Sequence, residues 1–176
     1  MNKSRRQWLL LGAGVTAAVA GAGLSWRKWA PSAPNRTASD KLWNSVFLGT
    51  GGESMPMAQW QGKPLLLNFW ATWCPPCVEE MPMLSEFQSQ HAQRIQVLGL
   101  AVDQVSAVKK FLDKTPVSYP VAMAGSLGLS IAKDLGNQGG GLPFSVFFDD
   151  KGAQMDSKVG KLDQSMLDDW LKELRG

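Results

Sequence analysis

Apolar residues along the chain alternate between continuous runs and runs with helical spacing. The runs over 64–70 and 95–101 are almost wholly apolar, so we expect them to be central strands that are buried on both faces. Apolar residues at intervals of three and four follow each run, which predicts a helix after each strand. This alternation of strands and helices is typical of an α/β domain.

The same patterns predict the remaining elements. The glycines between residues 49 and 52 separate two short apolar runs, which indicates a β-hairpin ahead of the main sheet. Asp163 stands where it can cap the last helix. The predicted strands cover 42–48, 54–60, 64–70, 95–101, 118–122, 144–148 and 154–159, and the predicted helices cover 77–91, 105–114, 127–135 and 164–174.

The only two cysteines of the chain, Cys74 and Cys77, lie where the strand over 64–70 gives way to the next helix. Two thiols at this spacing can form and release a small disulfide during a transfer of two electrons. Because the positive end of the helix dipole stabilises a thiolate, we expect Cys74 to be the attacking nucleophile. Cys77, shielded by Pro75 and Pro76, is then expected to be the resolving thiol.

The N-terminal part differs in composition from the rest. Residues 1–29 hold a basic head followed by an uncharged apolar stretch over 8–26, which predicts an export signal or a membrane anchor. Residues 30–41, rich in Pro, Ser, Ala and Asn, are predicted to be a linker, and 42–176 a single globular domain. Residues 4–10 fit both a twin-arginine signal and an ordinary basic leader, and cleavage stays open.

Charge narrows the classes of partner. The chain has a formal net charge of +3, but five basic residues and no acidic one precede Pro34. The remainder carries 13 basic against 15 acidic residues, a net charge of −2, so we expect no nucleic-acid partner. The leader predicts a periplasmic or other extracytoplasmic location, where residues 8–26 would attach the domain to the inner membrane if they are retained.

The segment FWATWCPPCVEEMP, residues 69–82, resembles the active-site segment of the extracytoplasmic thioredoxin-like proteins of the TlpA, ResA and CcmG (DsbE) group. The resemblance runs from about residue 42 to the C-terminus. It implies a thioredoxin fold, in which a central mixed sheet is flanked by helices, with an N-terminal β-hairpin extension. It also implies that Pro143 is cis and packs beside the disulfide. Leu142 would then offer its backbone to a bound substrate chain.

Two tryptophans lie close to the cysteine motif. Trp73, directly before the nucleophile, is expected to be half exposed and to form the substrate-docking surface together with Pro75, Pro76, Leu142 and Pro143. Trp70, inside the strand, is expected in the core.

Glu80 is the candidate general base. Thioredoxins themselves have a buried aspartate where this chain has Asn68, which cannot accept a proton from Cys77. In the TlpA and ResA group a glutamate three residues after the second cysteine is thought to assist instead, and Glu80 holds that position, one helical turn from Cys77. The alternative is that Glu79 and Glu80 are ordinary first-turn carboxylates that the helix dipole favours.

The resemblance implies a thiol-disulfide oxidoreductase that reduces protein disulfides outside the cytoplasm, of the cytochrome c maturation or oxidase copper-site assembly type. Its redox group would be the Cys74–Cys77 disulfide, with no bound cofactor and no metal. Its partners would be protein dithiols or disulfides and a transmembrane thiol donor, because the compartment supplies no electrons. A disulfide-introducing oxidant stays an alternative, since sequence does not reveal the reduction potential.

Two other classes of activity use the same cysteines. Cys74 and Cys77 could bind Cu(I) together with Met81 or Met83, although no distant histidine is apparent beside the motif. A peroxide-reducing site would need Thr and Arg near the reactive thiol, for which Thr72 and Arg94 are the candidates.

Overall fold

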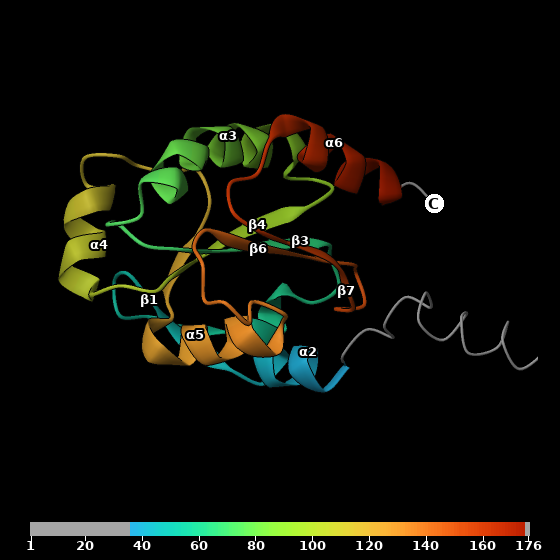
Figure 1. Cartoon of the computed structure of the whole chain (residues 1–176), viewed down its shortest axis with the longest axis horizontal. Helices are drawn as coiled ribbons and strands as arrows, with labels where there is room; N and C mark the ends of the chain where they lie inside the picture. Colours follow the sequence, from blue (N-terminus) through green and yellow to red (C-terminus); the bar gives the residue numbers. More distant parts are fainter. Residues whose placement is uncertain (1–35, 175–176) are drawn as a thin grey trace, which may run out of the picture. The chain divides into compact units, whose positions relative to one another are not determined.

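The computed structural model describes residues 36–174 and shows a central seven-stranded sheet with helices on both faces (Figure 1). The strand order is β2-β1-β5-β4-β3-β6-β7, with β3 parallel to β4 and antiparallel to β6. This is the mixed sheet of the thioredoxin fold, as predicted. The strands are β1 (Val46–Gly49), β2 (Ser54–Pro56), β3 (Leu65–Trp70), β4 (Gln96–Ala101), β5 (Val121–Met123), β6 (Phe144–Phe148) and β7 (Gln154–Val159).

The helices form a layer on each face of the sheet. Figure 1 shows α3 and α6 over one face and α2 and α5 over the other. The helices are α2 (Arg36–Trp43), the 3-10 helix η1 (Met57–Trp60), α3 (Pro75–His91), α4 (Val105–Leu112), α5 (Gly125–Asp134) and α6 (Gln164–Glu173).

Strand β3 divides the core into two halves. All six of its residues are buried, as the continuous apolar run predicted. Leu65, Leu67 and Phe69 pack with the core on the α2 and α5 face, whereas Leu66 and Trp70 pack with the core on the α3 and α6 face. Because side chains alternate along a strand, Asn68 lies on the same face as α3.

The N-terminal boundary differs from the prediction. Residues 36–41, predicted as linker, form α2 together with Leu42 and Trp43, for which the sequence predicts a strand. Both of these side chains are buried, and the Trp43 ring meets Phe148 at a centroid distance of 5.1 Å. This short helix owes its stability to tertiary packing, which a polar eight-residue segment does not reveal in its sequence.

The predicted hairpin extension is present, but it is shorter than expected. Strands β1 and β2 pair antiparallel, and β1 joins the main sheet by pairing antiparallel with β5. The first strand begins only at Val46, and the second ends at Pro56, where the chain turns into η1. Strand β5 also starts later than predicted, at Val121, directly after Pro120, which has no N–H for a strand ladder.

The predicted export signal or anchor over 1–29 lies outside the described residues. Within residues 36–174, no helix is both long enough and apolar enough to cross a membrane.

Candidate active site

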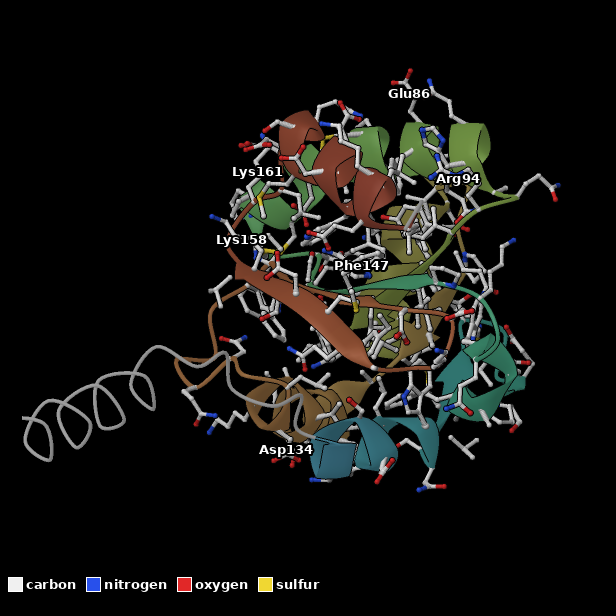
Figure 2. The ribbon with its side chains drawn as sticks, turned by 90° about the vertical axis from the view of Figure 1, so that its right-hand side faces the viewer. Glu86, Arg94, Asp134, Phe147, Lys158 and Lys161 are labelled. Carbon is white, nitrogen blue, oxygen red and sulfur yellow. A yellow bond between two sulfur atoms is a disulfide. The ribbon has the colours of Figure 1, made fainter. Side chains whose placement is uncertain are left out.

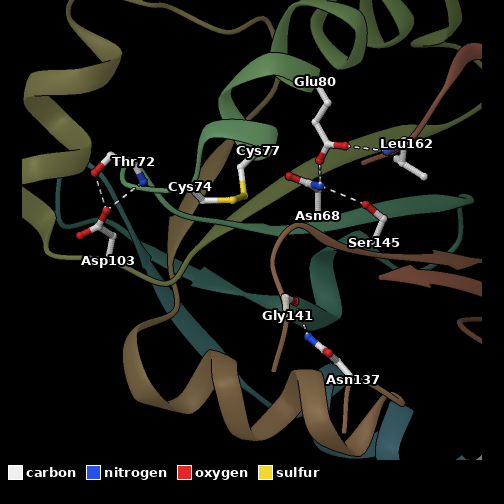
Figure 3. The surroundings of a disulfide bond; sticks show 10 residues. All are labelled: Asn68, Thr72, Cys74, Cys77, Glu80, Asp103, Asn137, Gly141, Ser145 and Leu162. Atoms are coloured by element: carbon white, nitrogen blue, oxygen red, sulfur yellow. Dashed lines mark hydrogen bonds between the residues drawn. A yellow bond between two sulfur atoms is a disulfide. The ribbon is translucent and has the colours of Figure 1, made fainter. Parts of the chain in front are cut away.

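The two cysteines lie at the junction of β3 and α3 and are joined by a disulfide, with a Cα–Cα distance of 5.3 Å (Figure 3). Cys74 is the N-cap of α3, and Pro75 and Pro76 occupy its first two positions, where a backbone N–H is not needed. Cys77 has no exposed surface, whereas Cys74 is 4% exposed. The neighbouring Trp73 is 66% exposed, somewhat more than the expected half. The arrangement leaves Cys74 as the sulfur that a partner would meet first.

Asp103, which the sequence analysis did not single out, braces the loop before Cys74. Its Oδ2 accepts hydrogen bonds from the backbone N–H and the hydroxyl of Thr72, at 2.9 and 2.6 Å, and its Oδ1 accepts from Gln104 N at 2.7 Å. Partial burial raises the pKa of this carboxyl, but the donated bonds outweigh it and hold the pKa below its ordinary value. The sequence signal that could have identified Asp103 is its place just after a buried parallel strand.

The loop before β6 adopts the expected form, since the Leu142–Pro143 peptide bond is cis. Pro143 is buried, and its carbonyl oxygen accepts a hydrogen bond from Gly160 N at 2.8 Å. Leu142 is half-buried and packs against the core that contains both cysteines. Asn137 holds the same loop by donating to Gly141 O at 2.8 Å (Figure 3). The structure therefore brings the Leu142–Pro143 loop and the disulfide to the same core.

Glu80, one turn after Cys77 in α3, is fully buried. Its Oε1 accepts from Asn68 Nδ2 at 2.7 Å, and its Oε2 accepts from Leu162 N at 2.8 Å (Figure 3). Burial raises the pKa of Glu80, although the bonds from Leu162 and Asn68 and the positive charge of Lys161 act in the opposite direction. No sequence signal points to Leu162, because nothing in a sequence marks which backbone N–H meets a buried carboxylate.

The two adjacent glutamates have different environments. Glu79 is exposed and pairs with Lys161 at 3.0 Å; because α3 begins at Pro75, earlier than predicted, neither glutamate lies in its first turn. Glu80 instead is buried and makes its hydrogen bonds inside the protein. Trp70 is fully buried, which confirms its assignment to the core.

Arg94 lies far from the cysteines. Arg94, labelled in Figure 2, follows the C-terminal end of α3, whereas Cys74 caps the N-terminal end. The Arg94 guanidinium donates a hydrogen bond to Leu171 O at 2.7 Å. The 17 residues of α3 separate the two ends by about 25 Å, so the Arg94 arrangement considered for peroxide reduction does not form. In the part of the chain that the structure describes, no three His, Cys, Asp or Glu side chains gather where they could hold a metal ion.

Comparison with known proteins agrees with this geometry. The sequence profile of the Redoxin family matches residues 32–171. The thiol-disulfide oxidoreductase ResA of Bacillus thuringiensis (strain Al Hakam) is 30% identical over 134 residues, which cover 74% of this chain and 75% of the relative.

Solved structures show the same similarity. A thiol:disulfide interchange protein of the thioredoxin family from Chlorobium tepidum has a TM-score of 0.66 and 30% identity, covering 75% of this chain and 93% of that one. A thioredoxin-related protein from Neisseria meningitidis serogroup B has a TM-score of 0.65 and 30% identity, covering 73% and 98%.

Proposed function

Because the chain belongs to the Redoxin family and is a thiol-disulfide oxidoreductase similar to the TlpA, ResA and CcmG group, we propose that it reduces protein disulfides outside the cytoplasm. The observation that carries the proposal is the Cys74–Cys77 pair at the N-terminus of α3, which shares a core with the loop that contains Leu142 and Pro143. This disulfide is the redox group of the proposed reaction, which needs no bound cofactor.

In the proposed reaction, the Cys74 thiolate attacks one sulfur of a partner disulfide, and the partner's other sulfur leaves as a thiolate that takes up a proton. A mixed disulfide then links Cys74 to the partner. Glu80 accepts the Cys77 proton, and the Cys77 thiolate attacks Cys74 Sγ. The Cys74–Cys77 bond forms as the bond to the partner breaks. The partner gains two electrons, and the enzyme becomes oxidised.

The docking surface in this proposal is made of Trp73, Pro75 and Pro76 at the start of α3, and of Leu142 and Pro143. The large exposed area of Trp73 supports such a role, because an exposed aromatic side chain beside a reactive sulfur offers apolar contact to a partner. The backbone of Leu142 would pair with the bound partner segment.

The location and the direction of transfer rest on the sequence. The basic and apolar leader over 1–29 supports export, and the resemblance to the ResA and CcmG group supports reduction, as in cytochrome c maturation or oxidase copper-site assembly. An oxidising compartment would not restore the dithiol, so a transmembrane thiol donor is part of the proposal.

Trapping tests the assignment of the two thiols. We expect Cys77→Ser to accumulate as mixed disulfides with partner proteins in its own compartment, because Cys74 attacks but nothing resolves the product. Cys74→Ser is the matched control and should trap no partner through the buried Cys77. The measurement is the appearance of thiol-sensitive high-mass bands on non-reducing gels. Bands that form with Cys74→Ser instead would reverse the two roles.

The midpoint potential tests the direction of transfer. The full chain would be equilibrated with thiol-disulfide buffers, and the fraction of alkylated thiols followed by mass. A midpoint near that of thioredoxin, about −270 mV, is expected of a reductant. A midpoint of about −120 mV would instead identify the alternative, a protein that introduces disulfides.

A further inference from the structure

The pairing of β3 with β6 places two polar side chains, those of Asn68 and Ser145, next to each other on the face of the sheet where Glu80 lies. Asn68 and Ser145 are direct partners in this antiparallel pair, so their side chains lie on the same face of the sheet. Both side chains are fully buried. Asn68 Nδ2 donates to Ser145 Oγ at 3.0 Å and to Glu80 Oε1 at 2.7 Å (Figure 3). A buried chain of hydrogen bonds therefore runs from β6 through β3 to α3.

The orientation of the Asn68 amide fits the ionised form of Glu80. Its Nδ2 donates hydrogen bonds to Glu80 and Ser145, and an ionised carboxylate can only accept hydrogen bonds. Asn68 Oδ1 is buried and has no hydrogen-bond partner among the described residues. A buried acceptor without a donor costs free energy. The two hydrogen bonds that Nδ2 donates therefore hold the amide in this orientation.

Rotation of the same amide by half a turn would fit the protonated form of Glu80. If Glu80 carries a proton, its hydroxyl needs an acceptor, and Asn68 Oδ1 would supply one after rotation about the last side-chain bond. Ser145 fits both orientations, because a hydroxyl can accept from Nδ2 or donate to Oδ1. Leu162 N cannot adapt in this way, since a backbone N–H only donates.

We propose that Asn68, held by Ser145, is a positioning residue for Glu80: its amide aims the carboxylate for removal of the Cys77 proton and turns over once Glu80 has taken it. This inference rests on the proposed function. The proton passes from Cys77 Sγ to a carboxylate oxygen of Glu80. The resulting thiolate closes the Cys74–Cys77 disulfide and expels the partner's sulfur, so that the enzyme loses two electrons and the partner gains them.

The other groups around Glu80 cannot take over this role. On α3 the neighbouring Glu79 is turned to solvent, where it pairs with Lys161. Lys161 acts on Glu80 only through its charge. Tyr119, which precedes β5, is buried, and burial followed by the charge of Glu80 raises the pKa of its hydroxyl far above the physiological range. Tyr119 therefore stays neutral while Glu80 changes charge.

The test uses the reduced full chain and Ellman's reagent as the disulfide. Attack by Cys74 releases one equivalent of thionitrobenzoate, and attack by Cys77 on the mixed disulfide releases the second. The rate of the second phase, recorded by stopped-flow absorbance across pH, isolates the step in which Glu80 acts. Variants Asn68→Leu and Ser145→Ala are measured alone and in combination with Glu80→Gln, and Ser89→Ala on the exposed far end of α3 is the control.

We expect Glu80→Gln to slow the second phase about 100-fold and Asn68→Leu about tenfold at neutral pH. Ser145→Ala should also slow the second phase. Because this variant keeps Asn68, it still tests the proposal if Asn68→Leu does not fold. Loss of the Asn68 bond should also move the pH profile to higher pH, because that bond favours the carboxylate. In the Glu80→Gln background, neither change should slow the phase by more than about twofold, because residues that act through one group are not additive.

The outcomes separate this inference from the proposed function. If Asn68→Leu and Ser145→Ala leave the second phase unchanged while Glu80→Gln slows it, the positioning role is wrong and the base role stands. Equal slowing in the presence and absence of Glu80 also overturns the positioning role, because the effect is then independent of the carboxylate. If Glu80→Gln itself changes nothing, both roles fail, whereas trapping by Cys77→Ser still tests the thiol chemistry.

Discussion

Glu80 shows how burial changes the behaviour of one side chain. A carboxyl group without exposed surface loses the hydration that favours its charge, and this desolvation is the main reason why its pKa is raised. The hydrogen bonds from Leu162 and Asn68 limit the effect. A carboxylate with a raised pKa takes up a proton more readily than a solvated glutamate does, which suits the base role proposed for Glu80.

The raised pKa also makes a prediction about stability. Between the unfolded and folded pKa values the native protein binds more protons at Glu80, so this contribution to stability is present at low pH and is lost as pH rises through the folded pKa. Glu80→Gln removes the titration. We therefore expect the unfolding free energy of the variant, relative to wild type, to improve as pH rises from the unfolded toward the folded pKa of Glu80 and to level off above it, as measured by urea denaturation of the oxidised protein between pH 4 and pH 8.

Glu79→Gln is the matched control, since it removes an exposed carboxylate one residue away. A difference between Glu80→Gln and wild type that stays constant over this pH range would contradict the raised pKa.

At the scale of elements, the last residue of helix α2 ties it to the core. Trp43 packs edge-on against Phe148, and its Nε1 donates to Gly152 O at 2.9 Å. At the exposed surface of the same helix, Lys41 pairs with Asp134 of α5 at 2.6 Å. The buried contact ties the helix to β6 and to the turn after it, whereas the ion pair is open to solvent.

The two contacts predict unequal losses of stability. Trp43→Ala should lower the unfolding free energy by about 3–5 kcal/mol, because it leaves a cavity and an unpaired carbonyl group. Lys41→Ala should cost less than about 1 kcal/mol, as is usual for an exposed ion pair. Urea denaturation of both variants measures the difference. Equal losses would mean that α2 is not held through its buried face.

At the scale of the whole molecule, the sheet grades from a buried centre to exposed edges. β3 lies between β4 and β6 with every side chain buried, while the outermost β2 and β7 hold mostly exposed residues. The active site is built where the central β3 ends, so the cysteines are attached to the most deeply buried strand. Rigid support of this kind keeps reacting groups in place.

This gradient predicts the pattern of amide hydrogen exchange. Amides of β3 that bond to β4 and β6 should exchange only when the whole domain unfolds, whereas those of β2 should exchange at least about 100-fold faster through local opening. Exchange followed by NMR or mass spectrometry at neutral pH gives both rates. If the amides of β2 and β3 were equally protected from exchange, the hairpin edge would not open separately from the rest of the domain, and the prediction would be wrong.

The sequence by itself determined the central elements and the chemistry of the site. The apolar run over 64–70 predicted a buried strand, and the motif from Cys74 to Cys77 after it indicated the disulfide and its place at a helix N-terminus. Local patterns suffice here because burial on both faces and helix capping leave a direct mark on neighbouring residues.

The tertiary structure decided which distant groups meet. The domain begins with α2 rather than at residue 42. Glu80 is hydrogen-bonded to Asn68 and Leu162, and Asn68 in turn to Ser145, so that four residues from four separate parts of the chain meet. No local pattern encodes such meetings, because strand register and the path of a loop place those atoms together. Burial then raises the pKa of Glu80, since desolvation depends on everything packed around the carboxyl group rather than on its neighbours in sequence.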